Sequence, residues 1–301
     1  MHAHISFFQA IVLGVTQGVT ELFPISSLGH GVLLPALFGW HNLVGAQTSG
    51  SSFYLAFLVG LHVGTAIGLI IFFWRTWVDL FGGLGRQVRL SRSNGVSSFV
   101  AFGDTRIDPQ YRRLALLVIG TIPVAVVGLV FEKKLRELFS KPLAAAIFLT
   151  INGLILFAGE FLRRRSETRR TLATTTIDTL SPTSALAVGT SQILALFAGI
   201  SRSGVTMVGG LLRGLDHEDS ATFAFLLATP VILLAGLYEL PKLLGPLGDG
   251  IRSQALVGAL CAGVASYLSA RFLTKFFTTH TLTPFAIYSL VAGLGCVAYF
   301  A

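Results

Sequence analysis

Residues 53–73 read FYLAFLVGLHVGTAIGLIIFF, an apolar run without Asp, Glu, Lys or Arg in which His62 is the only histidine. A helix needs roughly 20 such residues to cross the hydrocarbon core of a bilayer. Similar runs recur along the chain, and we expect spanning helices at about 53–74, 114–131, 142–162, 220–240, 251–272 and 282–300. The sequence therefore predicts an all-α integral membrane protein with six transmembrane helices.

The composition supports this fold class. Of the 301 residues, 53% are hydrophobic and only 12% are charged, and the mean hydropathy is +0.74. Soluble domains typically carry about 25% charged residues. The formal net charge is +8, but the basic residues lie mostly in loops between apolar runs. This pattern indicates contact with anionic membrane lipids and argues against nucleic acid as a partner.

The distribution of Lys and Arg predicts the orientation. The 75–113 loop holds seven arginines and the 163–181 loop holds five, and these two loops share a side because two spans separate them. Fifteen of the 22 basic residues fall on that side and six on the other. An excess of Lys and Arg marks the cytoplasmic side. Both termini are then expected to face outward.

Two further segments are apolar but broken by polar residues. The first runs from Ile5 to about Trp40 and the second from Pro182 to about Leu215. Each has the pattern of a helix, a polar turn and a second short helix, which predicts a re-entrant hairpin. Irregular backbone at membrane depth is tolerated only inside protein or beside a water-filled cavity. Both breaks are therefore expected to face the protein interior.

The two broken segments also resemble each other. A shift of 175 residues brings Gly14, Gln17, Ile25, Ser26 and Gly29 onto identical residues around the second break. We expect one polytopic domain over 1–301, with repeat halves at about 1–165 and 182–301. Each half has three spans, so the second is inverted relative to the first. Inverted repeats with broken helices commonly form a site at their interface, near the bilayer midplane.

The first break, QGVTELFPISSLGH over residues 17–30, concentrates polar groups. A carboxylate in an apolar segment normally faces a cavity or a partner, so Glu21 is a candidate metal ligand or general base. Gln17 lies four residues earlier, on the same helix face. Ser27 and its preceding serine are expected in the turn after the proline, and His30 is near enough to act there as an acid or base. A purely structural pairing of Glu21 with a basic residue is the alternative.

The second break reads AGISRSGVT over residues 198–206. Arg202 is the only basic residue between Arg170 and Arg213, and an arginine in this setting needs an anionic partner. Its planar fork suits bidentate phosphate binding. Hydroxyl groups surround it, at Ser201, Ser203 and Thr206. A buried ion pair between Arg202 and Glu21 without substrate is the alternative, and both could hold in the resting state.

The 53–73 run contains weaker candidates. His62 lies inside the span, and a local hydrogen bond is the simpler explanation for it. Gly60, Gly64 and Gly68 form a repeated G-x-x-x-G pattern, which is more typical of close helix packing than of a binding site.

Both breaks resemble the signature motifs of the undecaprenyl-pyrophosphate phosphatase family, also known as bacitracin-resistance proteins. The first family motif, (E/Q)-x-x-x-E followed by P-x-S-S-x-x-H, is matched by Gln17, Glu21, Pro24, Ser26, Ser27 and His30. The second, P-G-x-S-R-S-x-x-T, is matched by Gly199, Ser201, Arg202, Ser203 and Thr206. Ala198 replaces the expected proline, and Gln17 is the neutral option at its position. The resemblance covers essentially the whole chain.

The resemblance implies hydrolysis of undecaprenyl pyrophosphate to undecaprenyl phosphate and inorganic phosphate, which recycles the lipid carrier for peptidoglycan synthesis. It implies a divalent cation, Mg²⁺ or Ca²⁺, and an inner-membrane site that opens to the outer face. The implied catalytic residues are Glu21, also the metal ligand, with Ser27, His30 and Arg202. The implied phosphate cradle consists of Gln17, Ser26, Ser201, Ser203 and Thr206. Ser27 is the expected nucleophile, with His30 assisting proton transfer, and a water nucleophile with Ser27 as a ligand is the alternative.

A polyprenyl-phosphate transporter or flippase is the alternative function. The inverted repeat and midplane site suit alternating access as well as hydrolysis. A carrier would also need Arg202, but it would have less need of Glu21, Ser27 and His30 together. The sequence leaves open a homo-oligomer and an enzyme that also moves its product.

Overall fold

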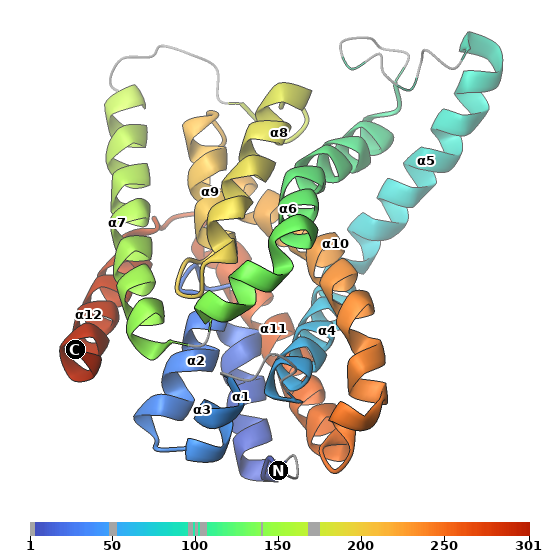
Figure 1. Ribbon diagram of the computed structural model, residues 1–301. Coiled ribbons are helices and arrows are strands. Elements are labelled where there is room, and N and C mark those ends of the chain that lie inside the picture. The colour runs from blue at the N-terminus through green and yellow to red at the C-terminus, as the bar shows by residue number, and fades with distance from the viewer. Residues whose placement is uncertain are drawn as a thin grey trace.

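The computed structural model describes residues 4–47, 53–95, 99, 102, 107–139, 141–167 and 175–301. The described part is helical and contains no strand (Figure 1). Six helices are long and apolar enough to cross a membrane, which confirms the predicted fold class. They are α4 (Phe53–Phe72), α6 (Pro109–Phe139), α7 (Pro142–Glu167), α10 (His217–Leu244), α11 (Arg252–Phe276) and α12 (Thr283–Phe300).

The main difference from the sequence prediction lies in the 75–113 loop. Most of its first half is a helix, α5 (Trp74–Asn94), which begins almost directly after α4. The arginines of this segment favour a loop in the sequence, but in the structure they lie on a helix. The helix α6 also begins five residues before the predicted span, at Pro109, and continues beyond it to Phe139. The short helices outside the spans and the broken segments are α3 (His41–Gln47) and η3 (Pro246–Gly248).

Both broken segments are helical on each side of a non-helical turn. The first comprises α1 (Phe7–Thr20) and α2 (Ser27–Leu37), and the second comprises α8 (Pro182–Ser191), η2 (Gln192–Leu196) and α9 (Arg202–Leu212). The residue before the second helix is a serine cap in each case: the Ser26 hydroxyl accepts from Gly29 N at 3.1 Å and the Ser201 hydroxyl from Gly204 N at 3.2 Å. Ser26 and Ser27 therefore belong to a helix start. The re-entrant path stays a prediction.

Each broken segment packs against a helix from the other half of the sequence. The first helix, α1, lies along α11, and a Cβ added to Gly14 would be 2.3 Å from the carbonyl oxygen of Gly258. At the position 175 residues later, Gly189 of α8 approaches Gly120 of α6 equally closely, with a Cβ-to-oxygen distance of 2.2 Å. Only glycine permits such backbone contact. The division into repeat halves remains a prediction. The packing of α1 on α11 and of α8 on α6 brings the two breaks to the centre of the molecule.

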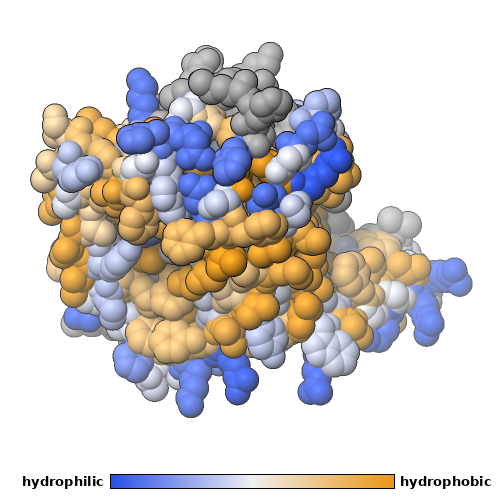
Figure 2. Space-filling view, turned by 90° about the horizontal axis from the view of Figure 1, so that it is seen from below, coloured by the Kyte–Doolittle hydropathy of each residue, from blue (hydrophilic) through white to orange (hydrophobic). Residues whose placement is uncertain are grey.

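The exterior carries many large apolar side chains, as expected where lipid replaces water. Examples are Leu256, Leu260 and Val264 on α11, each 63% exposed. Figure 2 shows hydrophobic residues across the middle of one face, with hydrophilic residues along two opposite margins. This surface and the six spans make the chain a multi-pass membrane protein.

Candidate active site

The two breaks touch each other through Ser26 and Gly199. Besides capping α2, the Ser26 hydroxyl accepts a hydrogen bond from Gly199 N at 3.1 Å. Both residues have left-handed backbone, with φ of 71° at Ser26 and 114° at Gly199. Ser26 is the only non-glycine residue with positive φ in the described part of the chain. Backbone strain of this kind persists where the surrounding contacts over-determine it, and it clusters at functional sites.

Asn152 of α7, which is not among the predicted site residues, joins both breaks from the side. Its Nδ2 donates to the carbonyl oxygen of Pro24 at 3.0 Å and to Ser289 Oγ at 3.1 Å. Its Oδ1 accepts from Ser201 N at 2.9 Å. The side chain is fully buried. An amide inside an apolar span is itself a signal for such a role, because polar groups at membrane depth need partners.

Glu21 is the centre of the polar cluster. It follows α1 directly and is 7% exposed. Its Oε1 accepts from Arg202 Nη2 of α9 at 2.9 Å. Its Oε2 accepts from Gln17 Nε2 at 3.0 Å and from the hydroxyl of Ser27. The structure thus joins four predicted site residues in one hydrogen-bonded group.

His62 of α4 lies beside this hydrogen-bonded group and lines the same cavity, although it was only a weak candidate in the sequence. Its Nε2 lies 3.5 Å from Glu21 Oε2. Its Nδ1 lies 2.8 Å from the carbonyl oxygen of Leu58, one helical turn earlier. Since a carbonyl oxygen only accepts, Nδ1 carries the proton, and the ring is held with Nε2 toward the carboxylate. The expected local hydrogen bond exists and serves to aim the ring.

A cavity of about 230 Å³ opens beside this cluster. Its polar lining includes Glu21, Ser27, His62 and Arg202, and apolar side chains of α6, η2 and α10 form much of the rest. The Arg202 side chain is 10% exposed and also donates from Nη1 to the carbonyl oxygen of Ala224 at 3.2 Å. Its Nε is buried without a hydrogen-bond partner. A buried guanidinium with an unused donor at a cavity is suited to binding an anion.

Gln192 is a second residue of the site that is not among the predicted site residues. Its Nε2 donates to the carbonyl oxygen of Gly120 at 3.0 Å, which fixes the amide orientation. Its Oε1 is buried without a partner, and the residue lines the cavity. The repeat pairs it with Gln17, and that pairing was the signal in the sequence. It offers a hydrogen-bond acceptor to a water or hydroxyl group.

Other predicted site residues hold the framework. The Nδ1 of His30 lies 2.7 Å from the carbonyl oxygen of Ser26, and its Nε2 lies 2.8 Å from Tyr288 Oη. The hydroxyls of Ser201 and Ser203 lie 3.0 Å apart, and Thr206 donates to the carbonyl oxygen of Arg202 at 2.6 Å. Of these residues, Ser201 lines the cavity, together with Ser26.

The donor set can be compared with the needs of a divalent cation. In the described part of the chain, no group of three or more His, Cys, Asp and Glu residues could hold a metal ion. The Glu21 carboxylate and the Ser27 hydroxyl are adjacent oxygen donors. Mg²⁺ is commonly bound by one or two carboxylates together with substrate phosphates. The site therefore fits a cation shared with a phosphate ligand.

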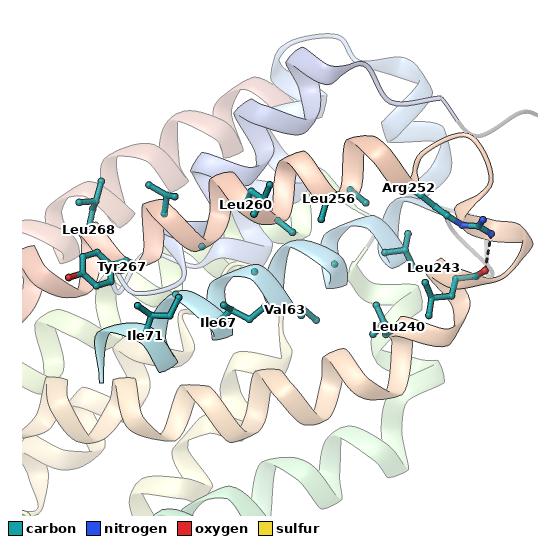
Figure 3. Close-up of a pocket in the computed structure, with 18 residues that line it drawn as sticks. Val63, Ile67, Ile71, Leu240, Leu243, Arg252, Leu256, Leu260, Tyr267 and Leu268 are labelled. Atoms are coloured by element: carbon teal, nitrogen blue, oxygen red, sulfur yellow. Dashed lines mark hydrogen bonds between the residues drawn. The ribbon is translucent and has the colours of Figure 1, made fainter. Parts of the chain in front are cut away.

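A larger hollow of about 660 Å³ lies elsewhere, between α4, α10 and α11 (Figure 3). Its wall is apolar, with residues such as Val63 and Leu256, and Arg252 at one end donates to the carbonyl oxygen of Leu244 at 2.8 Å. None of the predicted site residues lines it. Apart from Arg252 and Tyr267 the described residues of its lining are apolar, and they include no carboxylate, serine or threonine.

Comparisons with known proteins agree with the motifs. Residues 10–295 match the family model of bacitracin resistance protein BacA. The chain is 47% identical to undecaprenyl-diphosphatase 2 of Frankia alni, over 100% of this chain and 99% of that protein. It is 47% identical to the undecaprenyl-diphosphatase of Mycolicibacterium paratuberculosis, over 97% of each chain. It is also 43% identical to that of Granulibacter bethesdensis, over 97% of this chain and 96% of that protein. With its two motifs joined in one buried cluster, this chain belongs to the bacitracin resistance protein BacA family.

Proposed function

We propose that this chain is an undecaprenyl-diphosphatase, a hydrolase that converts undecaprenyl pyrophosphate to undecaprenyl phosphate and inorganic phosphate. The names of its relatives favour this activity over the polyprenyl-phosphate carrier. The observation that carries the proposal is the double engagement of Glu21. One carboxylate oxygen binds the anion-binding Arg202, and the other binds the hydroxyl of Ser27, at a cavity inside a membrane protein.

Ser27 is the proposed nucleophile, because its hydroxyl already donates to Glu21 Oε2. As Oγ attacks the terminal phosphorus, its proton passes to the Glu21 carboxylate. The bond between that phosphorus and the bridging oxygen breaks, and undecaprenyl phosphate leaves. Water then hydrolyses the phosphoserine and releases inorganic phosphate. In the alternative, water attacks directly, Glu21 accepts its proton and Ser27 binds a phosphate oxygen.

Phosphoryl transfer depends mainly on positioning and charge neutralisation. We assign phosphate binding to the Nε and Nη1 donors of Arg202, with the hydroxyls of Ser26 and Ser201 on the cavity wall. Gln192 Oε1 is placed to orient a water molecule. Ser203 and Thr206 support the Arg202 turn. Because both ring nitrogens of His30 contact Ser26 O and Tyr288 Oη, we assign His30 a supporting role at the first break and not direct proton transfer to the substrate.

A divalent cation, Mg²⁺ or Ca²⁺, belongs to this proposal. Glu21 and Ser27 would hold it together with the pyrophosphate. When bound, it would neutralise charge that develops on the phosphate oxygens.

The cellular setting is also part of the proposal. The excess of basic residues makes their side of the chain cytoplasmic. The family resemblance implies a bacterial inner-membrane protein whose cavity opens to the outer face. Undecaprenyl pyrophosphate would place its pyrophosphate in the cavity and leave its tail among the spans and lipids. The product would return to peptidoglycan synthesis as lipid carrier.

The test is phosphate release from undecaprenyl pyrophosphate by the detergent-purified protein, with and without a chelator. We expect cation-dependent release that Glu21→Gln and Arg202→Ala reduce by at least about a hundredfold. Ser27→Ala separates the two nucleophiles: serine attack predicts loss of turnover, and water attack predicts a measurable residual rate. A well-folded wild type that releases no phosphate with any divalent cation, but translocates the lipid intact, would refute the phosphatase.

A further inference from the structure

The helix α5 has a buried stripe that fixes it to the rest of the protein. Leu80, Gly83 and Gln87 are buried and lie on one face because they are spaced by three and four residues. This face packs on α6, and Figure 1 shows α5 at the edge of the bundle beside that helix. The opposite side of α5 is not covered by another described helix of the bundle.

Polar contacts fix the rotation of α5 about its own axis. Gln87 Oε1 accepts from Asp108 N at 2.7 Å. Arg86 donates to the Asp108 carboxylate from Nε at 2.7 Å and from Nη2 at 3.3 Å. Asp108 directly precedes α6, so the two helices are joined where α6 begins. Whatever faces away from α6 is therefore presented in a defined direction.

A second stripe of α5 is apolar and exposed. Trp74, Val78, Phe81 and Val88 are 55%, 60%, 59% and 41% exposed. Their spacing of four, three and seven residues puts them on one face. The helix nevertheless is not among the six candidate spans, because four arginines and one aspartate interrupt its apolar residues. An exposed apolar stripe on a helix too polar to span needs another environment.

The third stripe is basic and lies beside the apolar one. Arg75, Arg86 and Arg89 share this face with Asp79, and Arg92 follows at the end of the helix. The guanidinium of Arg75 lies 5.5 Å from the ring centre of Trp74, across the boundary between the two stripes. Cationic and apolar stripes side by side on one helix are typical of a helix in the bilayer interface.

We propose that α5 is an interfacial helix that binds the anionic phospholipids of the cytoplasmic leaflet. The helix starts two residues after the spanning helix α4 ends, so its first turn lies at the edge of the hydrocarbon core. The apolar stripe enters the acyl region, and the basic stripe binds lipid phosphates in the headgroup layer. The arginines are complementary in charge to those phosphates, which selects lipid over an apolar protein surface as the partner.

The two stripes can be compared at neighbouring positions of the full-length protein. A nitroxide label is attached at one introduced cysteine, either Phe81→Cys or Gly82→Cys, after the native cysteines are removed as Cys261→Ser and Cys296→Ser. The labelled protein is placed in vesicles of phosphatidylcholine and phosphatidylglycerol in equal parts. We expect the label at 81 to be relaxed mainly by dissolved oxygen and the label at 82 mainly by a water-soluble nickel chelate. Equal nickel access at both positions would place α5 in water and overturn the proposal. Spin–spin broadening at 81 would assign the stripe to a second copy and overturn it equally.

A second experiment tests whether the arginines bind lipid phosphates. Arg75, Arg89 and Arg92 are all changed to Gln in one variant, and Arg86 is kept because it contacts Asp108. In the mixed vesicles we expect the oxygen-to-nickel ratio at 81 to fall several-fold. In phosphatidylcholine alone the same substitutions should leave that ratio unchanged. Equal ratios with and without the arginines in the mixed vesicles would refute binding of anionic lipid. Unchanged phosphate release in detergent serves as the control for folding.

Discussion

The hydroxyl of Ser26 accepts a hydrogen bond from the backbone N–H of Gly199, 173 residues later in the chain, at 3.1 Å. The same oxygen caps α2 through Gly29 N. One side chain thus ends the first break and joins it to the second. The distance between Glu21 and Arg202, which flank these two positions, depends on this junction.

Ser26→Ala should therefore cost more than a lost cap. Removal of a cap typically costs about 1 kcal/mol, and a buried N–H left unpaired at Gly199 costs about 1–3 kcal/mol. We expect a lower midpoint of thermal unfolding in detergent and a loss of phosphate release. Ser181→Ala removes the exposed cap of α8, whose other hydrogen bonds, to the hydroxyls of Thr183 and Ser184, are local. It should have a much smaller effect on thermal stability and on phosphate release. Similar effects of the two substitutions would contradict the junction.

Asn152→Ala should destabilise the protein and weaken activity together. The change leaves the carbonyl oxygen of Pro24 and the N–H of Ser201 unpaired at a buried site, at about 1–3 kcal/mol for each group. Thermal unfolding and phosphate release are measured on the same sample. The exposed Asn42, whose amide donates to the carbonyl oxygen of His4, provides a matched control as Asn42→Ala. An Asn152→Ala protein as stable as that control would refute the bridge between the breaks.

Arg202→Lys should retain a fold and lose most activity. Lysine keeps the positive charge near Glu21, whereas Arg202→Ala leaves a buried carboxylate without its partner, a change that typically costs about 3–5 kcal/mol. A lysine cannot donate to Glu21, Ala224 O and a phosphate through a planar fork. We expect phosphate release to fall by at least about a hundredfold while thermal stability falls less than in Arg202→Ala. Near-normal turnover by the lysine variant would show that charge alone suffices.

His62→Ala should reduce activity although this residue lies outside both motifs. The substitution removes the ring that contacts Glu21 at 3.5 Å and widens the cavity. We expect at least about a tenfold lower turnover, with partial recovery in His62→Gln, which can restore a polar contact. The comparison is His280→Ala, an exposed histidine that stacks on Phe276. Equal turnover of the two alanine variants would remove His62 from the site.

The membrane fold class and the polar residues that form the buried cluster follow from the sequence alone. Apolar runs long enough to span a bilayer leave a helix as the solution, because every backbone polar group must be paired inside the segment. All six spans lie where these apolar runs predict them. Local spacing likewise indicated that Gln17 and Glu21 share a face and that each apolar segment breaks where Pro24 or Gly199 stands.

Which polar groups meet depends on the packing of the whole bundle. The contact of Glu21 with Arg202 spans 181 residues, and it depends on how the bundle brings the two breaks together. For the same reason His62 and Asn152, isolated polar residues in apolar runs, gained their roles only when their neighbours were known. The sequence also left open which residues of α5 are exposed, because its arginines favour a loop. The packing of α5 on α6 decides which face stays exposed. The local sequence pattern determines where helices form and which of their faces are polar, whereas long-range packing determines which side chains contact each other.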